Sequence, residues 1–488
     1  MPDYNLHFNT MTMKYNTRST IPMRCTKSAL RHRFYSAIYM ITLALFFQAC
    51  DEFVAVDVPK NQLIASGVFE EKATANAAMT DIYAKIRDFG LLTGTQAGLT
   101  HTLGLYADEL VFYGTTQNGN TAFYTNTLVA SSVEIRNIWN LSYNQIYAAN
   151  SVIAGVDGAV KLPQSDKDVL KGEALFVRAM LHFYLTNIYG GIPYITTTDY
   201  EQNRKVSRNT VSAVYDLAKA DLNAAIALLP NTYNGAGRTR PNKFAAYALL
   251  ARVCLYAGAW DESSNAASAV LNNTVLYPFE TDLNTIFLKE STSTIWQLSP
   301  KSPTGNTNEA ATFIFTSTPP ALSAMNEDLV LAFEVGDQRA VKWVKTIING
   351  GSRWYHPFKY KKKTNTGTVE NSIIFRLGEL YLIRAEARAR AGELIGAKGD
   401  LNVIRTTAGL GNTTALTQEE LLTAILQERR VELFTEFGHR FFDLKRFNRI
   451  NPVLSASKSG WDANDVLFPI PETEIDLNGT LAPQNPGY

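Results

Sequence analysis

The chain has 488 residues, with 46 basic and 45 acidic side chains and a formal net charge of +1. This balance argues against a nucleic-acid-binding protein, because such proteins usually carry a clustered surplus of basic residues. Hydrophobic residues make up 46% and charged residues 19% of the chain, which excludes global disorder. Aromatic residues make up 11%, and we expect some of them to contact a ligand.

The first 49 residues have the pattern of an export signal. Basic residues stand between Arg24 and Arg33, and an almost wholly apolar run of 16 residues, 34–49, follows them. A basic start, a short apolar run and a small residue before the cleavage point are typical of a secretory signal peptide. The alternative, a permanent membrane helix, needs about 20 apolar residues. Residues 1–22 are polar and precede Met23, which favours a start codon assigned too early.

Phe47-Gln48-Ala49-Cys50 resembles a bacterial lipobox, in which the thiol is acylated and the signal is cut just before it, although Phe47 stands where Leu is usual. The acidic pair that follows, Asp51-Glu52, resembles the surface-export signal of Bacteroidota lipoproteins. Without residues 1–49 the chain holds 40 basic and 44 acidic residues. We therefore predict an acidic protein anchored by a lipid on Cys50.

The chain has only three cysteines, Cys25, Cys50 and Cys254. If the first is removed with the signal and the second is acylated, Cys254 has no partner for a disulfide or a cysteine-based zinc site. Cys254 lies in an apolar stretch, where a lone cysteine is usually a small buried hydrophobic residue.

Apolar residues at spacings of three and four predict helices at 69–87, 133–156, 172–189 and 211–229. The third is the clearest, and Gly190-Gly191 with Pro193 just beyond is a typical helix end. The segment Gly90–Tyr124 breaks this periodicity with many Gly and Thr residues, and it predicts long loops.

Two later stretches, Ala251–Gly258 and Ala385–Gly392, each place an Ala six residues before an Ala-Gly pair. Small residues at helical spacing let two helices pack closely, so repeated helix pairs of this size favour tetratricopeptide-like repeats. The alternative is two ordinary helical hairpins in an α-helical protein.

Residues 277–370 lack helical periodicity for most of their length and are rich in Thr, Ser, Pro and Gly. Within them, Thr294–Leu298 and Ala340–Val344 alternate in polarity and predict short strands. This segment reads as an insertion in a helical frame, where binding residues tend to lie. After about residue 465, Pro469 and Pro471 oppose helix formation, so we expect an extended tail.

The last third of the chain carries an ordered series of strings. They are IIFRLGELYL at 373–382, ERRVEL at 428–433, GHRFFDLKR at 438–446, FPIPE at 468–472 and QNPGY at 484–488. This series resembles the SusD/RagB family of nutrient-binding outer-membrane lipoproteins. The likeness extends over essentially the whole chain after the signal, and it includes YGGIP at 189–193.

The resemblance implies a signal peptide at 1–49 and one SusD-like domain at 50–488. That domain would be mainly α, with about four tetratricopeptide-like helix pairs at about 69–272 and 373–447, a loop-rich variable insertion with a few short strands at about 277–370, and a tail at about 465–488. It also implies a lipoprotein on the outer face of the outer membrane that binds oligosaccharides or polysaccharide and delivers them to a SusC-type TonB-dependent transporter. The alternative within the family is peptide cargo.

Ligand contacts are expected from aromatic side chains, because the flat C–H faces of sugar rings stack on them while polar neighbours bind the hydroxyls. Two clusters lie in segments expected to be irregular. The first spans Tyr106–Tyr124 and supplies Tyr113, Asn118, Asn120 and Tyr124; the second supplies Arg353, Trp354 and Tyr355. The alternative for both clusters is loop packing. Buried positions are expected for the other tryptophans: Trp296 and Trp343 in strands, Trp139 and Trp260 in helices.

No catalytic motif of the GxSxG, HExxH, GxGxxG or Walker type is present. The resemblance also implies no catalytic activity, and we predict no cofactor and no metal site. Glu428 and Glu432 share one helical face, where the interleaved arginines should pair with them and lower their pKa, which disfavours a general acid. A glycoside hydrolase and a protein-binding scaffold remain as the less favoured alternatives.

Overall fold

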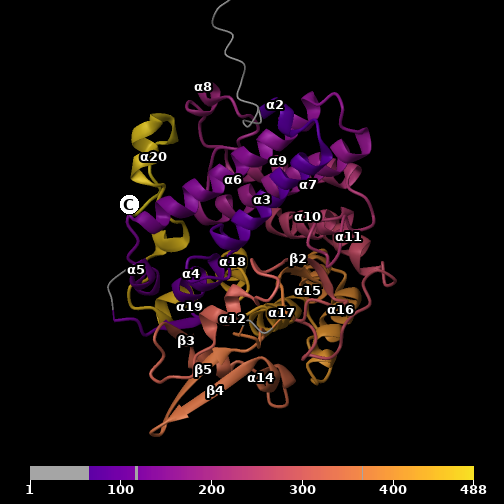
Figure 1. Cartoon of the computed structure of the whole chain (residues 1–488). Coiled ribbons are helices and arrows are strands. Elements are labelled where there is room, and N and C mark those ends of the chain that lie inside the picture. The colour runs from indigo at the N-terminus through magenta and orange to yellow at the C-terminus, as the bar shows by residue number, and fades with distance from the viewer. Residues whose placement is uncertain (1–64, 116–118, 365–366) are drawn as a thin grey trace, which may run out of the picture. The chain divides into compact units, whose positions relative to one another are not determined.

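The computed structural model describes residues 65–115, 119–364 and 367–488, all within one compact unit, Leu63–Tyr488. The predicted signal peptide and Cys50 lie outside the described residues. Long helices dominate this unit, and its strands are few and short (Figure 1). The predicted mainly α class is confirmed.

Helix pairs form the frame of the unit. The long helices are α3 (Lys72–Asp88), α6 (Val133–Gly158), α7 (Gln164–Tyr189), α9 (Val211–Leu228), α10 (Lys243–Ala257), α11 (Trp260–Leu271), α15 (Leu377–Arg390), α16 (Leu394–Thr407) and α17 (Gln418–Glu432). Helix α3 packs against α6, α7 against α9, α10 against α11, and α15 against α16. These four antiparallel pairs are the tetratricopeptide-like repeats that the small-residue pattern predicted.

The repeat pattern in the sequence has a direct structural cause. Ala251 and Ala385 are fully buried, and the hydroxyl of Ser263 in α11 donates a hydrogen bond of 2.8 Å to the Ala251 carbonyl, so the two helices lie close together. Gly258 and Gly392 follow α10 and α15 with φ of 76° and 87°. Glycine adopts this left-handed conformation without strain, and it therefore lets each helix end and the chain turn back.

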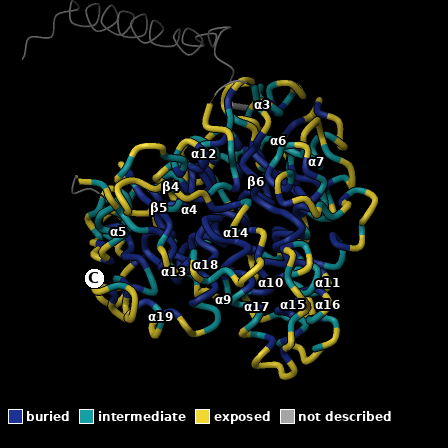
Figure 2. The backbone as a smooth tube through the Cα atoms, turned by 90° about the horizontal axis from the view of Figure 1, so that it is seen from below, coloured by how far each residue is buried: buried dark blue, intermediate teal, exposed yellow. Residues whose placement is uncertain are grey.

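A buried ion pair joins three of the repeats. Arg252 of α10 donates hydrogen bonds to both carboxylate oxygens of Glu379 in α15, at 2.7 and 2.6 Å, and to the hydroxyl of Tyr184 in α7 at 2.6 Å. Removing one partner of such a pair leaves a buried charge uncompensated, at a typical cost of about 3–5 kcal/mol. The pair therefore fixes the repeats in one register. Figure 2 shows the buried backbone gathered in the interior of the unit.

Shorter elements fill the remaining segments. The helices are α2 (Ala65–Val68), α4 (Leu99–Tyr106), α5 (Gly119–Thr125), α8 (Tyr200–Asn203), α12 (Asn308–Phe313), α13 (Glu327–Leu331), α14 (Gln338–Lys342), α18 (His439–Arg446), α19 (Ile450–Ser457) and α20 (Glu472–Leu477), with 3₁₀ turns η1 (Ala463–Val466) and η2 (Gly479–Leu481). The strands are β1 (Leu110–Phe112), β2 (Thr294–Leu298), β3 (Ser323–Met325), β4 (Val344–Asn349), β5 (Ser352–Pro357) and β6 (Ser372–Arg376).

The described residues form three antiparallel two-stranded sheets: β1 with β3 and β2 with β6 connect distant segments, whereas β4 and β5 are consecutive strands. The predicted strand at Thr294–Leu298 is confirmed as β2, and its pairing with β6 joins the insertion to the start of α15. Strands β4 and β5 form a hairpin that lies at the lower end of the view in Figure 1. Their turn, Gly350-Gly351, has φ of 55° and 86°, which only glycine adopts readily.

Three local predictions were wrong. Gly90–Tyr124 is not a run of loops, because it contains α4, β1 and α5; α4 is buried on every side, so no amphipathic pattern marks it. Ala340–Val344 is not a strand, since α14 ends at Lys342 and β4 begins only at Val344. The tail is not wholly extended, because Pro471 precedes α20 as its N-cap, a position where the missing N–H of proline costs nothing.

The predicted burial of three tryptophans agrees with the structure, although Trp343 directly follows α14 and is not in a strand. Trp296 and Trp343 have no exposed surface, and Trp139 is 3% exposed. Trp260 is only half-buried, and the Arg390 guanidinium lies over its ring at 5.1 Å. Among the described residues, no helix is both long enough and apolar enough to cross a membrane.

Candidate functional site

The two aromatic clusters of the sequence meet in the structure. Tyr113 follows β1, and its backbone N–H donates a hydrogen bond of 2.8 Å to the carbonyl of Leu322, just before β3. Strand β3 also contacts β5, which carries Trp354. Partial burial and the neighbouring Tyr124 raise the pKa of the Tyr113 hydroxyl. The Trp354 indole lies beside this hydroxyl, and its N–H lowers the same pKa by donating a hydrogen bond. Tyr113 and Trp354 are called the aromatic pair below.

The hairpin register separates the three residues predicted in β5. Trp354 lies opposite Ile347 and shares its face with His356, whereas Arg353 and Tyr355 lie on the other face. Tyr355 packs against the hydrophobic cluster around Trp343, so its ring is partly committed to the interior. Arg353 is exposed near the turn. Of the three, Trp354 therefore joins the aromatic pair, and Arg353 and Tyr355 do not.

The first predicted cluster divides into core and surface. Tyr106, Asp108, Glu109 and Phe123 are buried, so these four positions serve packing. Tyr113 is 37% exposed. Tyr124 is half-buried, with the Lys458 ammonium 4.1 Å above its ring. Asn118 lies outside the described residues.

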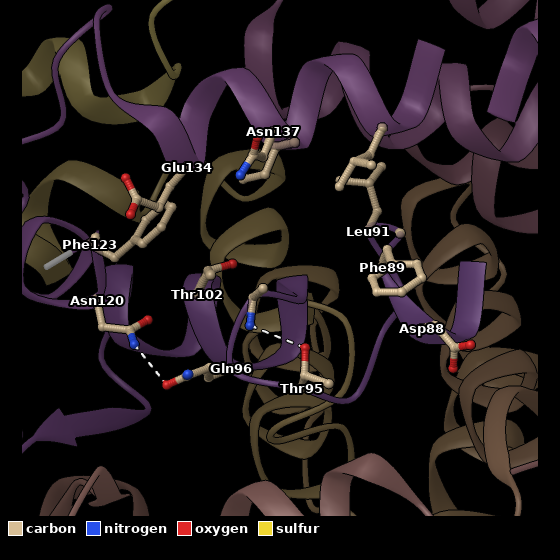
Figure 3. Close-up of a pocket in the computed structure, with 15 residues that line it drawn as sticks. Asp88, Phe89, Leu91, Thr95, Gln96, Thr102, Asn120, Phe123, Glu134 and Asn137 are labelled. Carbon is tan, nitrogen blue, oxygen red and sulfur yellow. Dashed lines mark hydrogen bonds between the residues drawn. The ribbon is translucent and has the colours of Figure 1, made fainter. Parts of the chain in front are cut away.

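A cavity of about 430 Å³ lies between the end of α3, the loop that follows it, α4, α5 and α6. We call it the α5 cavity; its lining residues are Asp88, Phe89, Gly90, Leu91, Thr95, Gln96, Ala97, Thr102, Gly119, Asn120, Phe123, Glu134, Asn137, Ile138 and Leu141. Figure 3 shows Asn120 and Phe123 on one side and Phe89 and Asp88 on the other. A volume of this size fits one or two sugar rings.

The α5 cavity offers aromatic rings and side-chain amides beside two carboxyl groups, those of Asp88 and Glu134. Phe89 is 62% exposed and offers a free aromatic face, while Phe123 closes the opposite wall. The Asn120 side chain donates a hydrogen bond of 3.1 Å to the Gln96 amide oxygen (Figure 3), and Asn137 is exposed. Asp88 is bridged to Arg87 at 2.8 Å, which lowers the pKa of its carboxyl.

Helix α5 links the cavity to the aromatic pair. Asn120 and Tyr124 stand four residues apart, so both side chains lie on the same face of this short helix. Asn120 lines the cavity, and Tyr124 lies close enough to Tyr113 to raise the pKa of its hydroxyl. Sequence reasoning found Asn120 but missed Phe89, Gln96 and Asn137. The available signal was Phe89 itself, a large apolar residue directly after a helix end.

A second cavity, of about 480 Å³, was not predicted at all. It lies between α6, α8 and α20, and four of its sixteen lining residues are aromatic: Trp139, Tyr143, Tyr147 and Tyr200. Tyr147 and Tyr200 are 52% and 73% exposed there, and Tyr143 donates a hydrogen bond of 2.8 Å to the Pro193 carbonyl. Neither residue of the aromatic pair lines this cavity, so its exposed tyrosines provide control positions for the experiments below.

The acidic motif on α17 is structural, although its partners differ from those predicted. Glu428 and Glu432 pair with Arg339 at 2.6 and 2.8 Å, and Glu432 also pairs with Arg376. The interleaved Arg429 pairs instead with a carboxylate of α18. Burial raises the pKa of Glu432, but Arg376 and Arg339 outweigh it and lower that pKa to about 2. For Glu428, burial prevails and raises the pKa, contrary to our prediction.

No metal centre is evident in residues 65–115, 119–364 and 367–488, where no group of three or more His, Cys, Asp or Glu residues could hold an ion. His182 has a structural role. Its ring stacks on Tyr194 at 3.8 Å, its Nδ1 lies 2.8 Å from the Arg178 carbonyl, and its Nε2 accepts a hydrogen bond of 3.0 Å from the Ile195 N–H. Burial lowers its pKa to about 3, so the ring stays neutral.

Two family models match this chain. A model described as "Starch-binding associating with outer membrane" matches residues 70–255, and the SusD family model matches residues 340–488. Together they cover the helix pairs apart from α11 and the end of α10, and they include the hairpin and the tail. The chain belongs to the SusD/RagB family, as the ordered motifs predicted.

Individual relatives agree. The SusD-like protein P2 of Formosa agariphila is 27% identical, over 72% of this chain and 80% of that protein. A SusD superfamily protein from Bacteroides vulgatus has a TM-score of 0.74 at 22% identity, over 86% of this chain and 100% of the other. A laminarin-binding SusD-like protein has a TM-score of 0.73 at 23% identity, with the same coverage. These structural likenesses establish the shared fold.

Proposed function

We propose that this protein is a cell-surface glycan-binding lipoprotein, which captures oligosaccharides at the aromatic pair and delivers them to a SusC-type TonB-dependent transporter. The observation that carries the proposal is the meeting of Tyr113 and Trp354, two partly exposed aromatic residues from distant segments, beside α5. Family membership supports it, as does a solved relative described as laminarin-binding.

The chemistry of the site suits a sugar. A pyranose ring presents C–H groups on its flat face, which pack against an indole or phenol ring, and its edge presents hydroxyls that need hydrogen-bond partners. The aromatic pair supplies the first kind of contact. The amides of Asn120, Gln96 and Asn137 in the α5 cavity supply the second. We propose that a chain of a few sugars spans the two through α5.

Several features favour binding without catalysis. A glycoside hydrolase needs two carboxyl groups that flank an accessible bond. Glu428 and Glu432 are buried among arginines. Glu109 and Glu309, whose pKa burial raises to about 7, are 2% and 4% exposed, so a polymer does not reach them.

The lipid anchor and the division of the chain into repeats and an insertion are also proposals. Cys50, which precedes the described residues, would carry the lipid, and the protein would face the cell exterior. We also keep the division into helical repeats at about 69–272 and 373–447 and a variable insertion at about 277–370. The aromatic pair would then combine a residue from the repeat region with one from the insertion.

The proposal is tested with protein beginning at residue 51, which retains the whole compact unit, in native gels that each contain one polysaccharide. We expect one polymer to retard the protein, and Trp354→Ala and Tyr113→Ala to abolish the retardation. Tyr200→Ala, which removes an exposed aromatic ring from the second cavity, is the matched control. Retardation that survives both substitutions but is lost in the control would contradict the proposed site.

Failure of every polymer and short oligosaccharide to bind would contradict the proposed glycan cargo. Isothermal titration with peptides would then be the next measurement. Delivery is tested separately by co-purification of the full-length protein with a TonB-dependent transporter from outer membranes. Recovery of the protein free of any such transporter would contradict the proposed partnership.

A further inference from the structure

The segment that forms the hairpin has an unusual charge. Between Gln338 and Val369 the chain holds eight basic residues and no acidic residue. They are Arg339, Lys342, Lys345, Arg353, Lys359, Lys361, Lys362 and Lys363. The chain without residues 1–49 has more acidic than basic residues, so this concentration is not a reflection of overall composition.

Two of the eight have a structural role. Arg339 is buried among Asp337 and the acidic residues of α17, and Lys359 pairs with Glu436. The other six, Lys342, Lys345, Arg353, Lys361, Lys362 and Lys363, form no ion pair with any carboxylate in the described part of the chain. Other surface lysines do pair with acids, as Lys171 does with Asp157 and Lys72 with Asp166. The six therefore create a positive potential, which Asp282 and Glu370 compensate in part near Lys361 and Lys362.

Part of this charge lies on the same face as Trp354. Lys345 pairs with His356 in the β4–β5 register, and Trp354 is the diagonal neighbour of Lys345, a separation of roughly 7–8 Å. Lys363 donates a hydrogen bond of 2.8 Å to the carbonyl of Ile314. Burial lowers the pKa of the His356 ring, and the positive charges of both lysines lower it further. Lys345 therefore lies on the Trp354 face of the hairpin, and both lysines lie near His356, which shares that face.

The nearest acids do not neutralise these two lysines. The Glu370 carboxylate is buried and accepts hydrogen bonds from the backbone N–H groups of Lys361 and Lys362, at 2.7 and 3.1 Å. Asp282 interacts with Lys361, on the side of the hairpin that carries Asn284. The α5 cavity holds Asp88, already bridged to Arg87, and Glu134, which accepts a hydrogen bond from Ser132. Negative charge therefore stays on the cavity side, and positive charge stays at the hairpin.

We propose that the glycan bound at the aromatic pair is anionic, with a carboxylate or sulfate group seated between Lys345 and Lys363. This inference rests on the proposed function and narrows its substrate class. The aromatic pair supplies a stacking surface that is indifferent to charge. The lysines add attraction that acts over about 10 Å at 0.1 M salt, so they select acidic sugars and speed their capture.

The test compares polymers that share one backbone and differ only in charge. Polygalacturonate against its methyl ester examines the carboxylate, and a sulfated galactan against its desulfated form examines the sulfate. We expect the charged member of one pair to bind at least about tenfold more tightly at low salt, and this advantage to disappear at high salt because exposed charges are screened. Equal binding of both members in both pairs would overturn the inference.

Matched variants locate the charge effect. Lys345→Gln with Lys363→Gln should remove the preference for the charged polymer and leave binding of its neutral counterpart unchanged. Lys161→Gln with Lys205→Gln, an equal loss of charge at exposed positions elsewhere, should behave as the unchanged protein. A hairpin variant that keeps the full preference overturns the inference.

Two further outcomes are distinguishable. Binding of neutral polymers only would overturn the inference and leave the proposed function intact, whereas no binding of any polymer would remove both. Vesicles of phosphatidylcholine with and without phosphatidylglycerol test a membrane surface. Lysine-dependent binding to the anionic vesicles, without binding to any charged polymer, would overturn the glycan assignment.

Discussion

Arg440 donates two hydrogen bonds to the Asp108 carboxylate, at 2.8 and 2.7 Å, across 332 residues of sequence. Both side chains are buried, and Arg430 adds a longer contact of 3.4 Å. Asp108 stands two residues before β1, and β1 leads directly to Tyr113. This ion pair therefore fixes the segment that carries one half of the aromatic pair to helix α18. Helix α18 therefore acts as a clamp on this segment.

Asp108→Ala should destabilise the fold strongly. The substitution leaves Arg440 buried without its partner, and the free energy of unfolding should fall by about 3–5 kcal/mol. Urea denaturation measures this value. Asp157→Ala is the control, because its pair with Lys171 is exposed and should contribute less than about 1 kcal/mol. Equal effects of the two substitutions would contradict the clamp.

Substitution of Tyr355 and of Trp354, which are neighbours in β5, should have opposite effects on stability and glycan affinity. Tyr355→Ala removes a ring that packs against the cluster around Trp343, so it should lower the free energy of unfolding by about 2–4 kcal/mol and leave glycan affinity nearly unchanged. Trp354→Ala should lower affinity and change stability much less. Denaturation and native gel retardation of both variants give the comparison. A loss of affinity in Tyr355→Ala at unchanged stability would move the site to the other hairpin face.

Glu309 should make stability depend on pH. Burial raises the pKa of its carboxyl to about 7, although the Ser372 hydroxyl donates a hydrogen bond of 2.7 Å to it. Between pH 4.5 and 7 the folded chain keeps this proton and the unfolded chain releases it, so the contribution of Glu309 to stability falls as pH rises. Glu309→Gln removes the cost of burying an ionised carboxylate. The variant should gain on the order of 1–3 kcal/mol over the unchanged protein between about pH 5 and 8.

Only the difference between the two proteins isolates Glu309. Buried histidines act in the opposite sense: burial lowers the pKa of His101 to about 4, so its contribution to stability rises with pH between 4 and 6.5. Glu290→Gln, at a side chain that is 81% exposed, is the control and should follow the unchanged protein at every pH. A parallel curve for Glu309→Gln would show that the carboxyl is ionised throughout.

Cys50→Ala should release the protein from the membrane. The substitution removes the thiol that would carry the lipid, and no helix in the described ranges would hold the protein there. Fractionation of cells measures the result. Cys254→Ala is the control and should leave the protein in the membrane fraction, because Cys254 is fully buried. Membrane retention of Cys50→Ala would contradict the anchor.

Local patterns in the sequence were sufficient to predict the helical frame of this protein. Apolar spacing predicted the long helices because their burial is one-sided or complete over many turns, and Ala251 and Ala385 revealed close helix packing because only small residues permit it. The burial of Cys254 followed from its apolar surroundings. Helix α4 escaped detection because it is buried on all sides and therefore has no polar face.

The site depended on tertiary structure. Trp354 and Tyr355 are adjacent and chemically alike in the sequence, and only strand pairing places one beside Tyr113 and the other against the core. The α5 cavity joins residues of four elements, which no local pattern connects. Glu428 and Glu432 share one helical face, yet their pKa values shift in opposite directions, because burial and the arginines of other segments decide the balance at each carboxyl. Sequence determines local preference at each position, whereas binding requires distances between segments, and those exist only after the chain has packed.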